Sequence, residues 1–166
     1  MSPQAEQQLG LRPDLITDAI AISSLIHWIG NRMTTTGTAA YSRFNLGFLD
    51  ARIVYALAQT TPMRSAELAA RLAVDRAAIS RAVGRLTAQS LVYLGPKRRL
   101  LLTPQGKVLV PAVADVFEDR CLTLVADITD EERSTVLRLL GRLQWNARLV
   151  TTLTTEQAAN SVEGLP

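Results

Sequence analysis

Residues 73–86, AVDRAAISRAVGRL, combine an apolar helical face with a face on which cations alternate with small side chains. At about 100° per residue, the apolar residues that share one face are Ile79, Ala82, Val83 and Leu86. The opposite face and its margins carry Arg76, Ala77, Ser80, Arg81, Gly84 and Arg85. A helix that enters the major groove of DNA needs short outward residues, so that its backbone can approach, and a few long hydrogen-bond donors. This face meets both requirements.

Each residue type on this face has a chemical use at a DNA surface. Arg76 and Arg81 can donate paired hydrogen bonds to guanine or to phosphate, and Ser80 can bond to a base edge or a phosphate. Ala77 can contact a thymine methyl group. Gly84 costs about 1 kcal/mol relative to alanine inside a helix, which leaves two explanations: close approach to the groove, or relief of a crowded helix crossing. A solvated basic face without a ligand is the alternative for the whole surface.

The neighbouring segments predict the elements that hold this helix. Residues 65–72, SAELAARL, predict a helix with Ser65 at its N-cap, and Asp75 is the expected N-cap of the next helix. Two helices joined by so short a break form a helix-turn-helix. Residues 90–103 predict a β-hairpin with three adjacent cations at its tip, which suit a phosphate backbone or a narrow minor groove. The predicted DNA-binding set is Ser65, Asp75, Arg76, Ala77, Ser80, Arg81, Gly84, Arg85, Lys97, Arg98 and Arg99.

Longer helices are expected on both sides of this region. Thr103 and Pro104 suit an N-cap and a first helical position, and Thr129 with Glu132 forms a capping box. The long helices carry more apolar surface than a small core can cover, which predicts a homodimer interface. The expected elements are a helix over 13–33, a polar connection over 31–44, helices over 49–59, 104–126 and 130–153, and a frayed tail from 156.

The distribution of charge supports a polyanion-binding region inside a larger scaffold. The chain of 166 residues has a net charge of only +3, but residues 64–107 hold nine Lys and Arg against two acids. One histidine and one cysteine leave no metal cluster and no disulfide, and the sequence has neither a phosphate loop nor a nucleophile elbow. We therefore expect no enzyme activity and no cofactor. The sequence also lacks a signal peptide and an apolar run of membrane-spanning length, so a cytoplasmic protein is expected.

Four segments within residues 13–150 carry a resemblance to one protein family: FNLGFLDARIVYALAQ, MRSAELAARLAVDRAAISRAVGRLTAQSLV, RRLLLTPQG and ITDEERSTVLRLLGRL. Together they resemble the multiple antibiotic resistance regulator (MarR) family of bacterial transcription factors. The resemblance implies a mainly α fold, with a winged helix-turn-helix over 45–103 between dimerisation helices in 13–44 and 104–153. It also implies a homodimeric repressor that binds a near-palindromic double-stranded DNA operator and is released by a small aromatic or phenolic ligand. The alternative is a winged helix used for protein contact alone.

Two positions depart from the family pattern. The hairpin tip reads Gly-Pro-Lys-Arg-Arg, which is shorter than the family's wing and lacks the acid that precedes its arginines. Ser90 replaces the glycine that usually precedes Leu-Val, so serine must tolerate that backbone conformation. The reach of the wing and the shape of the turn before it are therefore open questions.

The effector site is expected where the family tends to bind its ligands, between the dimerisation helices and the winged helix. The candidates near it are His27, Trp28, Tyr41, Phe44, Arg52 and Tyr55. The alternative is structural: aromatics at these spacings are typical of a core, a lone histidine is usually buried and satisfied, and Arg52 can pair with an acid. Cys121 suggests an oxidant sensor, but it lies far from the first helix, where the family's thiol sensors place their cysteine, and Arg120 is its only adjacent cation.

Overall fold

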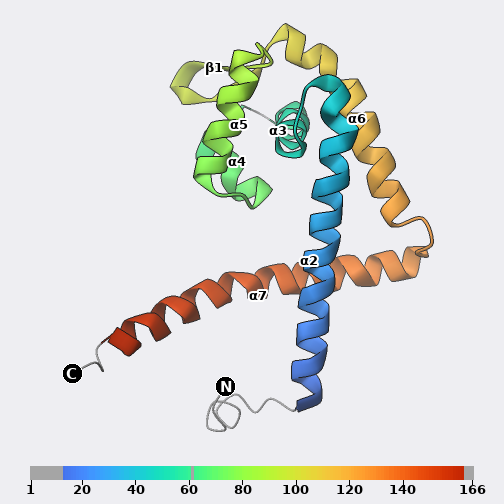
Figure 1. Ribbon diagram of the computed structural model, residues 1–166, viewed down its shortest axis with the longest axis vertical. Helices are drawn as coiled ribbons and strands as arrows, with labels where there is room; N and C mark the ends of the chain where they lie inside the picture. The colour runs from blue at the N-terminus through green and yellow to red at the C-terminus, as the bar shows by residue number, and fades with distance from the viewer. Residues whose placement is uncertain (1–12, 61, 163–166) are drawn as a thin grey trace. The chain divides into compact units, whose positions relative to one another are not determined.

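The structure is a computed structural model that describes residues 13–60 and 62–162 (Figure 1). Its elements are the helices α2 (Pro13–Tyr41), α3 (Phe48–Ala58), α4 (Ser65–Leu72), α5 (Arg76–Ala88), α6 (Pro104–Leu124) and α7 (Asp130–Val162), the strands β1 (Val92–Leu94) and β2 (Leu100–Leu102), and the 3-10 turns η1 (Ser42–Phe44) and η2 (Pro96–Arg98). The chain divides into two compact units after Glu118. The mainly helical fold with one hairpin is confirmed. None of the described helices is long and apolar enough to cross a membrane.

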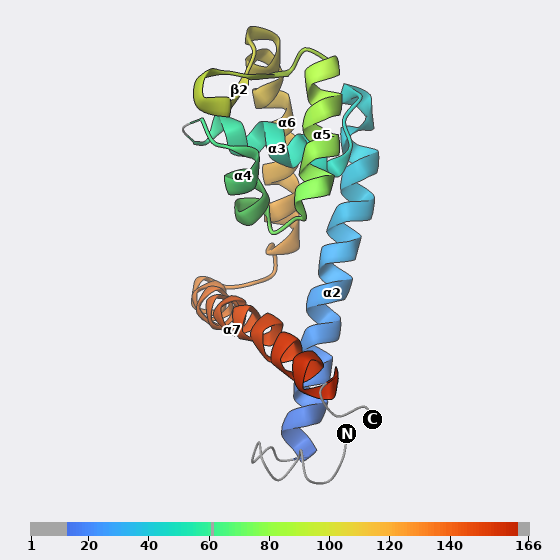
Figure 2. The same ribbon diagram turned by 90° about the vertical axis from the view of Figure 1, so that its left-hand side faces the viewer.

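A winged helix-turn-helix forms the core of the first unit. Helices α3, α4 and α5 pack against one another, and the antiparallel hairpin pairs Val92 with Leu102 and Leu94 with Leu100. Figure 2 shows these three helices beside one another, with the hairpin at one end of them. The fully buried side chains at the centre include Ile53, Val54, Leu68, Ile79, Leu86, Val92 and Leu100. Their removal from water supplies the main stabilisation of the region that carries the predicted site.

Helix α2 is longer than the sequence predicted. The polar connection expected over 31–44 is wrong, because the helix continues to Tyr41 and only then gives way to the 3-10 turn η1. Threonines of this segment donate their hydroxyl hydrogens to carbonyls four residues earlier, for example Thr34 to Gly30 at 2.9 Å. Gly37 is buried, and a Cβ at this position would lie 2.4 Å from the Phe48 ring. A glycine inside this helix therefore lets α2 approach α3.

The predicted helix starts are mostly confirmed. The Asp75 carboxylate accepts the Ala78 N–H at 2.7 Å, and the Thr103 hydroxyl accepts the Gly106 N–H at 2.9 Å. Ser65 is the exception: it is the first helical residue of α4, and Arg64 occupies the N-cap. The Arg64 N–H donates to Glu67 at 2.8 Å. The acid three residues downstream thus supplies the cap that we assigned to a serine hydroxyl.

The turn between α5 and the hairpin retains the conformation expected of a glycine. Ser90 has a φ of 58°, in the left-handed region, and its N–H bonds to the Thr87 carbonyl at 2.9 Å. Gly106, the glycine of LTPQG, packs directly on this turn, because a Cβ at that position would lie 2.1 Å from the Leu91 carbonyl oxygen. Helix α6 therefore approaches the turn too closely for any larger residue.

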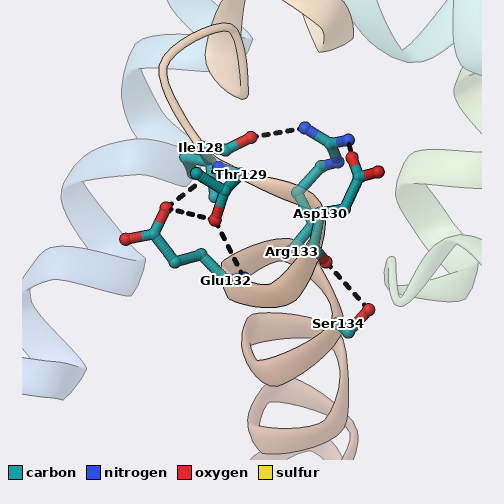
Figure 3. A network of polar contacts seen from close by, with 6 residues as sticks. All are labelled: Ile128, Thr129, Asp130, Glu132, Arg133 and Ser134. Carbon is teal, nitrogen blue, oxygen red and sulfur yellow. Dashed lines mark hydrogen bonds and ion pairs between the residues drawn. The ribbon is translucent and has the colours of Figure 1, made fainter.

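Helix α7 in the second unit begins with the predicted capping box. The Thr129 N–H donates to Glu132 Oε2 at 2.9 Å, and the Glu132 N–H donates to the Thr129 hydroxyl at 3.4 Å (Figure 3). The bond from the Thr129 N–H, and after it a bond from the Thr129 hydroxyl to the same carboxylate oxygen at 2.9 Å, lower the pKa of Glu132. Arg133 pairs with Asp130 and donates to the Ile128 carbonyl. The helix extends to Val162, so the predicted helix end at 153 and the predicted frayed tail from 156 are both wrong. Residues 163–166 lie outside the described residues.

Candidate nucleic-acid interface

Helix α5 presents the two faces that its sequence predicts. Ile79, Ala82 and Leu86 are fully buried against α3, α4 and the hairpin region. The exposed residues of the helix include Arg76, Ala77, Ser80, Arg81 and Gly84. One continuous outward surface therefore carries two arginines, a hydroxyl and the small residues between them.

The structure bears on one of the two explanations for Gly84, the crowded helix crossing. A Cβ built on this glycine meets no heavy atom within 4 Å. Relief of a crowded helix crossing is therefore wrong as an explanation. The conformational cost of glycine in mid-helix is incurred at a site open to solvent, on the same face as Arg81 and Ser80.

Arg85, at the margin of this face, is held by the protein itself. Its Nη2 donates to Asp50 Oδ1 at 2.7 Å and its Nε to Asp50 Oδ2 at 3.3 Å. The hydrogen bond that Arg85 donates to Asp50 raises the pKa of Arg85, partial burial opposes the rise, and the charge of Asp50 adds to it. Asp50 is buried in the first turn of α3, so this pair links α3 to α5. Sequence reasoning missed Asp50, although a lone carboxylate in the apolar pattern of 49–57 was a signal that it has a cationic partner.

Arg99, at the base of the wing, is also engaged within the protein. It donates to the Pro62 carbonyl and lies 3.9 Å from the Glu67 carboxylate. The next residue continues the attachment, because the Leu100 N–H bonds to the Met63 carbonyl at 2.8 Å. Arg99 therefore fastens the hairpin to the segment that precedes α4.

Lys97 and Arg98 form the outer tip of the wing. Both are exposed, and both have left-handed backbones, with φ of 55° and 56°. They share a cleft of about 680 Å³ with Arg64 and Ser65 at the start of α4. The structure thus brings the predicted Ser65 together with the wing cations and adds Arg64, a cation that sequence reasoning did not select.

The comparisons with known proteins agree with this architecture. Residues 44–99, which run from the end of η1 to the base of the wing, match the model of the MarR family. The match thus covers the winged helix-turn-helix region and leaves most of the long helices outside it. A comparison with curated proteins yields no match.

Solved MarR-type structures share the fold at low sequence identity. A MarR/EmrR family regulator from Acinetobacter sp. ADP1 is 20% identical with a TM-score of 0.74, over 79% of this chain and 97% of that one. The S. aureus MepR–DNA complex is 20% identical with a TM-score of 0.68, over 75% and 95% of the two chains. A MarR family regulator from Listeria monocytogenes, complexed with 26mer DNA, is 19% identical with a TM-score of 0.66, over 73% and 85%.

The six effector candidates lie on three elements of the described chain, α2, η1 and α3. His27 and Trp28 are exposed on α2, Trp28 by 64%, so the structural alternative of a buried histidine and a core tryptophan is wrong for this pair. Tyr41 is fully buried, with its ring centroid 6.4 Å from that of Phe48, and is a core residue. Phe44 is half-buried, beneath the Arg43 guanidinium.

Arg52 and Tyr55 are the candidates that line a common cavity. This cavity of about 400 Å³ is bounded by residues of α3, the end of α4 and α6, including Arg71 and Phe117. The Tyr55 and Phe117 ring centroids are 4.7 Å apart. The Arg52 guanidinium donates to the Leu72 carbonyl at 3.0 Å, a backbone partner where the sequence suggested an acid, and burial lowers its pKa. Cys121 is half-buried and does not line this cavity.

Proposed function

We propose that this protein is a transcriptional regulator that binds double-stranded DNA in a sequence-dependent manner. Helix α5 enters the major groove, and the wing follows the adjacent phosphates or minor groove. The observation that carries the proposal is the exposed face of α5, where Arg76, Ser80 and Arg81 surround a glycine with open space before it. The structures of two neighbours, MepR and the Listeria regulator, are complexes with DNA.

The proposed active form is a cytoplasmic homodimer on a near-palindromic operator. Helices α2 and α7 support this form, because each exposes a row of large apolar side chains that a monomer leaves in water. Two-fold symmetry would give the operator two equivalent half-sites. The exposed apolar residues are Leu15, Ile20, Ile22, Leu25, Ile26, Trp28 and Ile29 on α2, and Val136, Leu137, Leu139, Leu140, Leu143 and Trp145 on α7.

The proposed effector is a small aromatic or phenolic anion that relieves repression. The cavity beside α3 favours this chemistry, since it offers the guanidinium groups of Arg52 and Arg71 together with the rings of Tyr55 and Phe117. Benzoate and its neutral analogue benzamide provide a simple test. Benzoate should weaken DNA binding by the wild type, and benzamide should do so much less. If Arg52→Gln retains the full response to benzoate, the cavity is not the effector site.

The DNA-binding proposal is tested by selecting duplex fragments from the source genome with the full-length protein. Affinity for a selected fragment should fall steeply as salt rises, because bound phosphates release counterions. Arg81→Ala should weaken binding and relax the preference at one base pair by about 1–3 kcal/mol. A protein that selects no fragment, or binds duplex without salt dependence, would support the protein-contact alternative. An unchanged base preference in Arg81→Ala would remove α5 as the reading helix.

A further inference from the structure

Asp50 is the one buried charged side chain among residues whose burial the structure describes, 15–60 and 62–148. A carboxylate excluded from water is costly unless hydrogen bonds and an opposite charge compensate for the lost hydration. Asp50 has both kinds of compensation. Its Oδ2 accepts the Gly47 N–H at 3.1 Å, and its two oxygens accept the two bonds from Arg85.

The Asp50–Arg85 pair leaves part of the guanidinium available. An arginine has five N–H donors, and the side-on contact with Asp50 uses one from Nε and one from Nη2. The Arg85 side chain remains 52% exposed, at the margin of the face that carries Arg81 and Gly84. Because a guanidinium is planar and rigid, a carboxylate that binds one edge also fixes the direction of the other donors.

The pair also joins two elements that are far apart in the chain. Asp50 lies in the first turn of α3, where it accepts the N–H of the N-cap residue, and Arg85 lies in the last turn of α5. The carboxylate therefore restrains both the Arg85 side chain and the helix that carries it.

We propose that Asp50 is a positioning residue for DNA binding, which holds Arg85 so that its free donors meet a phosphate at the edge of α5. This inference rests on the proposed function, because it assigns a role at the same DNA interface. The inference predicts an unusual effect of removing a negative charge on DNA binding. Removing an acid from a DNA-binding surface ordinarily strengthens binding, since it reduces repulsion of the phosphates. Removal of the Asp50 charge should instead weaken binding.

The test compares Asp50→Asn with Asp115→Asn in the full-length protein on a duplex fragment selected by the wild type. Asp115 is an exposed acid on α6, so Asp115→Asn removes the same charge without breaking the Asp50–Arg85 contact. We expect Asp50→Asn to bind about tenfold more weakly, with a salt slope lower by about one phosphate contact. Asp115→Asn should bind as the wild type does or slightly more tightly.

A second comparison separates positioning from general stability. Arg85→Gln should lower the salt slope by the same amount, and adding Asp50→Asn to it should produce little further loss. Circular dichroism establishes the temperature below which each variant is folded. If Asp50→Asn does not fold, the salt slope of Arg85→Gln alone tests the proposed phosphate contact. An unchanged or stronger Asp50→Asn, additive losses in the double variant, or an unchanged slope in Arg85→Gln would each overturn the inference. If the wild-type protein does not bind duplex DNA, the proposed function itself is overturned.

Discussion

The winged helix and the long helices use apolar residues differently, although both show the same helical spacing in the sequence. In the winged helix, the stripe of α5 is buried within its own chain, and Ile79 is 0% exposed. In α2, the stripe faces water over most of its length, and Ile26 is 45% exposed. An apolar stripe therefore indicates that a surface will be covered, but it does not say whether the same chain covers it. The winged helix buries its apolar stripe within one chain, whereas the single chain leaves the stripe of α2 in water.

The largest expected effect is on the winged-helix core. Ile79→Ala should lower the free energy of unfolding by about 2–5 kcal/mol, because it leaves a cavity among fully buried side chains. Urea denaturation measures this loss. The matched variant in a non-core position is Ala77→Ser, on the exposed face of α5, which should change stability by no more than about 0.5 kcal/mol. Equal losses in the two variants would contradict the burial described for α5.

The second prediction concerns the exposed stripe of α2. Ile26→Glu should weaken self-association at least about a hundredfold, equivalent to about 2.7 kcal/mol, because the charge would be buried in the proposed interface. Sedimentation equilibrium measures the dissociation constant. Ser24→Glu places the same charge at an exposed polar position of the same helix and serves as the control. If Ile26→Glu associates as the wild type does, the α2 stripe is not the dimer surface.

The third prediction compares free and anchored cations of the wing. Replacing Lys97 and Arg98 with alanine should weaken binding to all duplex sequences alike and lower the salt slope by about two phosphate contacts. Arg99→Ala should change the slope much less and should loosen the hairpin, because Arg99 donates to Pro62 and faces Glu67. Salt titrations and amide hydrogen exchange of β2 measure the two effects. The distinction fails if Arg99→Ala lowers the slope as much as the outer pair does.

The smallest expected effect separates stability from binding. Gly84→Ala should stabilise the fold by up to about 1 kcal/mol, because alanine favours the helix and the added methyl group meets nothing. The same variant should weaken DNA binding, since that methyl group would occupy the surface that approaches the groove. Gly141→Ala in α7 also has open space before it and should stabilise without changing affinity for DNA. Unchanged DNA binding by Gly84→Ala would place Gly84 outside the interface.

The features that were predictable from sequence depend on neighbours within a few residues. Helical periodicity placed the faces of α5, and hydrogen-bond chemistry placed the caps at Asp75 and Thr103. The length of α2 was missed because threonines have low helix propensity, and their hydroxyl bonds to preceding carbonyls become visible only once the helix exists. The six effector candidates were chosen for their expected position between helices, and the shared cavity of Arg52 and Tyr55 depends on packing that the sequence does not show.

The sequence by itself determined which residues could face a polyanion: a basic segment, an amphipathic helix with small outward residues and a cationic hairpin. Tertiary structure decided which of those cations are free to do so. Arg85 meets a carboxylate 35 residues away and keeps only part of its guanidinium available, and Arg99 meets a carbonyl 37 residues away. Arg81 and the wing tip remain exposed. Gly84 likewise became informative only when the space before it was seen to be open. Helix faces follow from the local repeat of the backbone, but the partner of a long charged side chain depends on how distant segments pack.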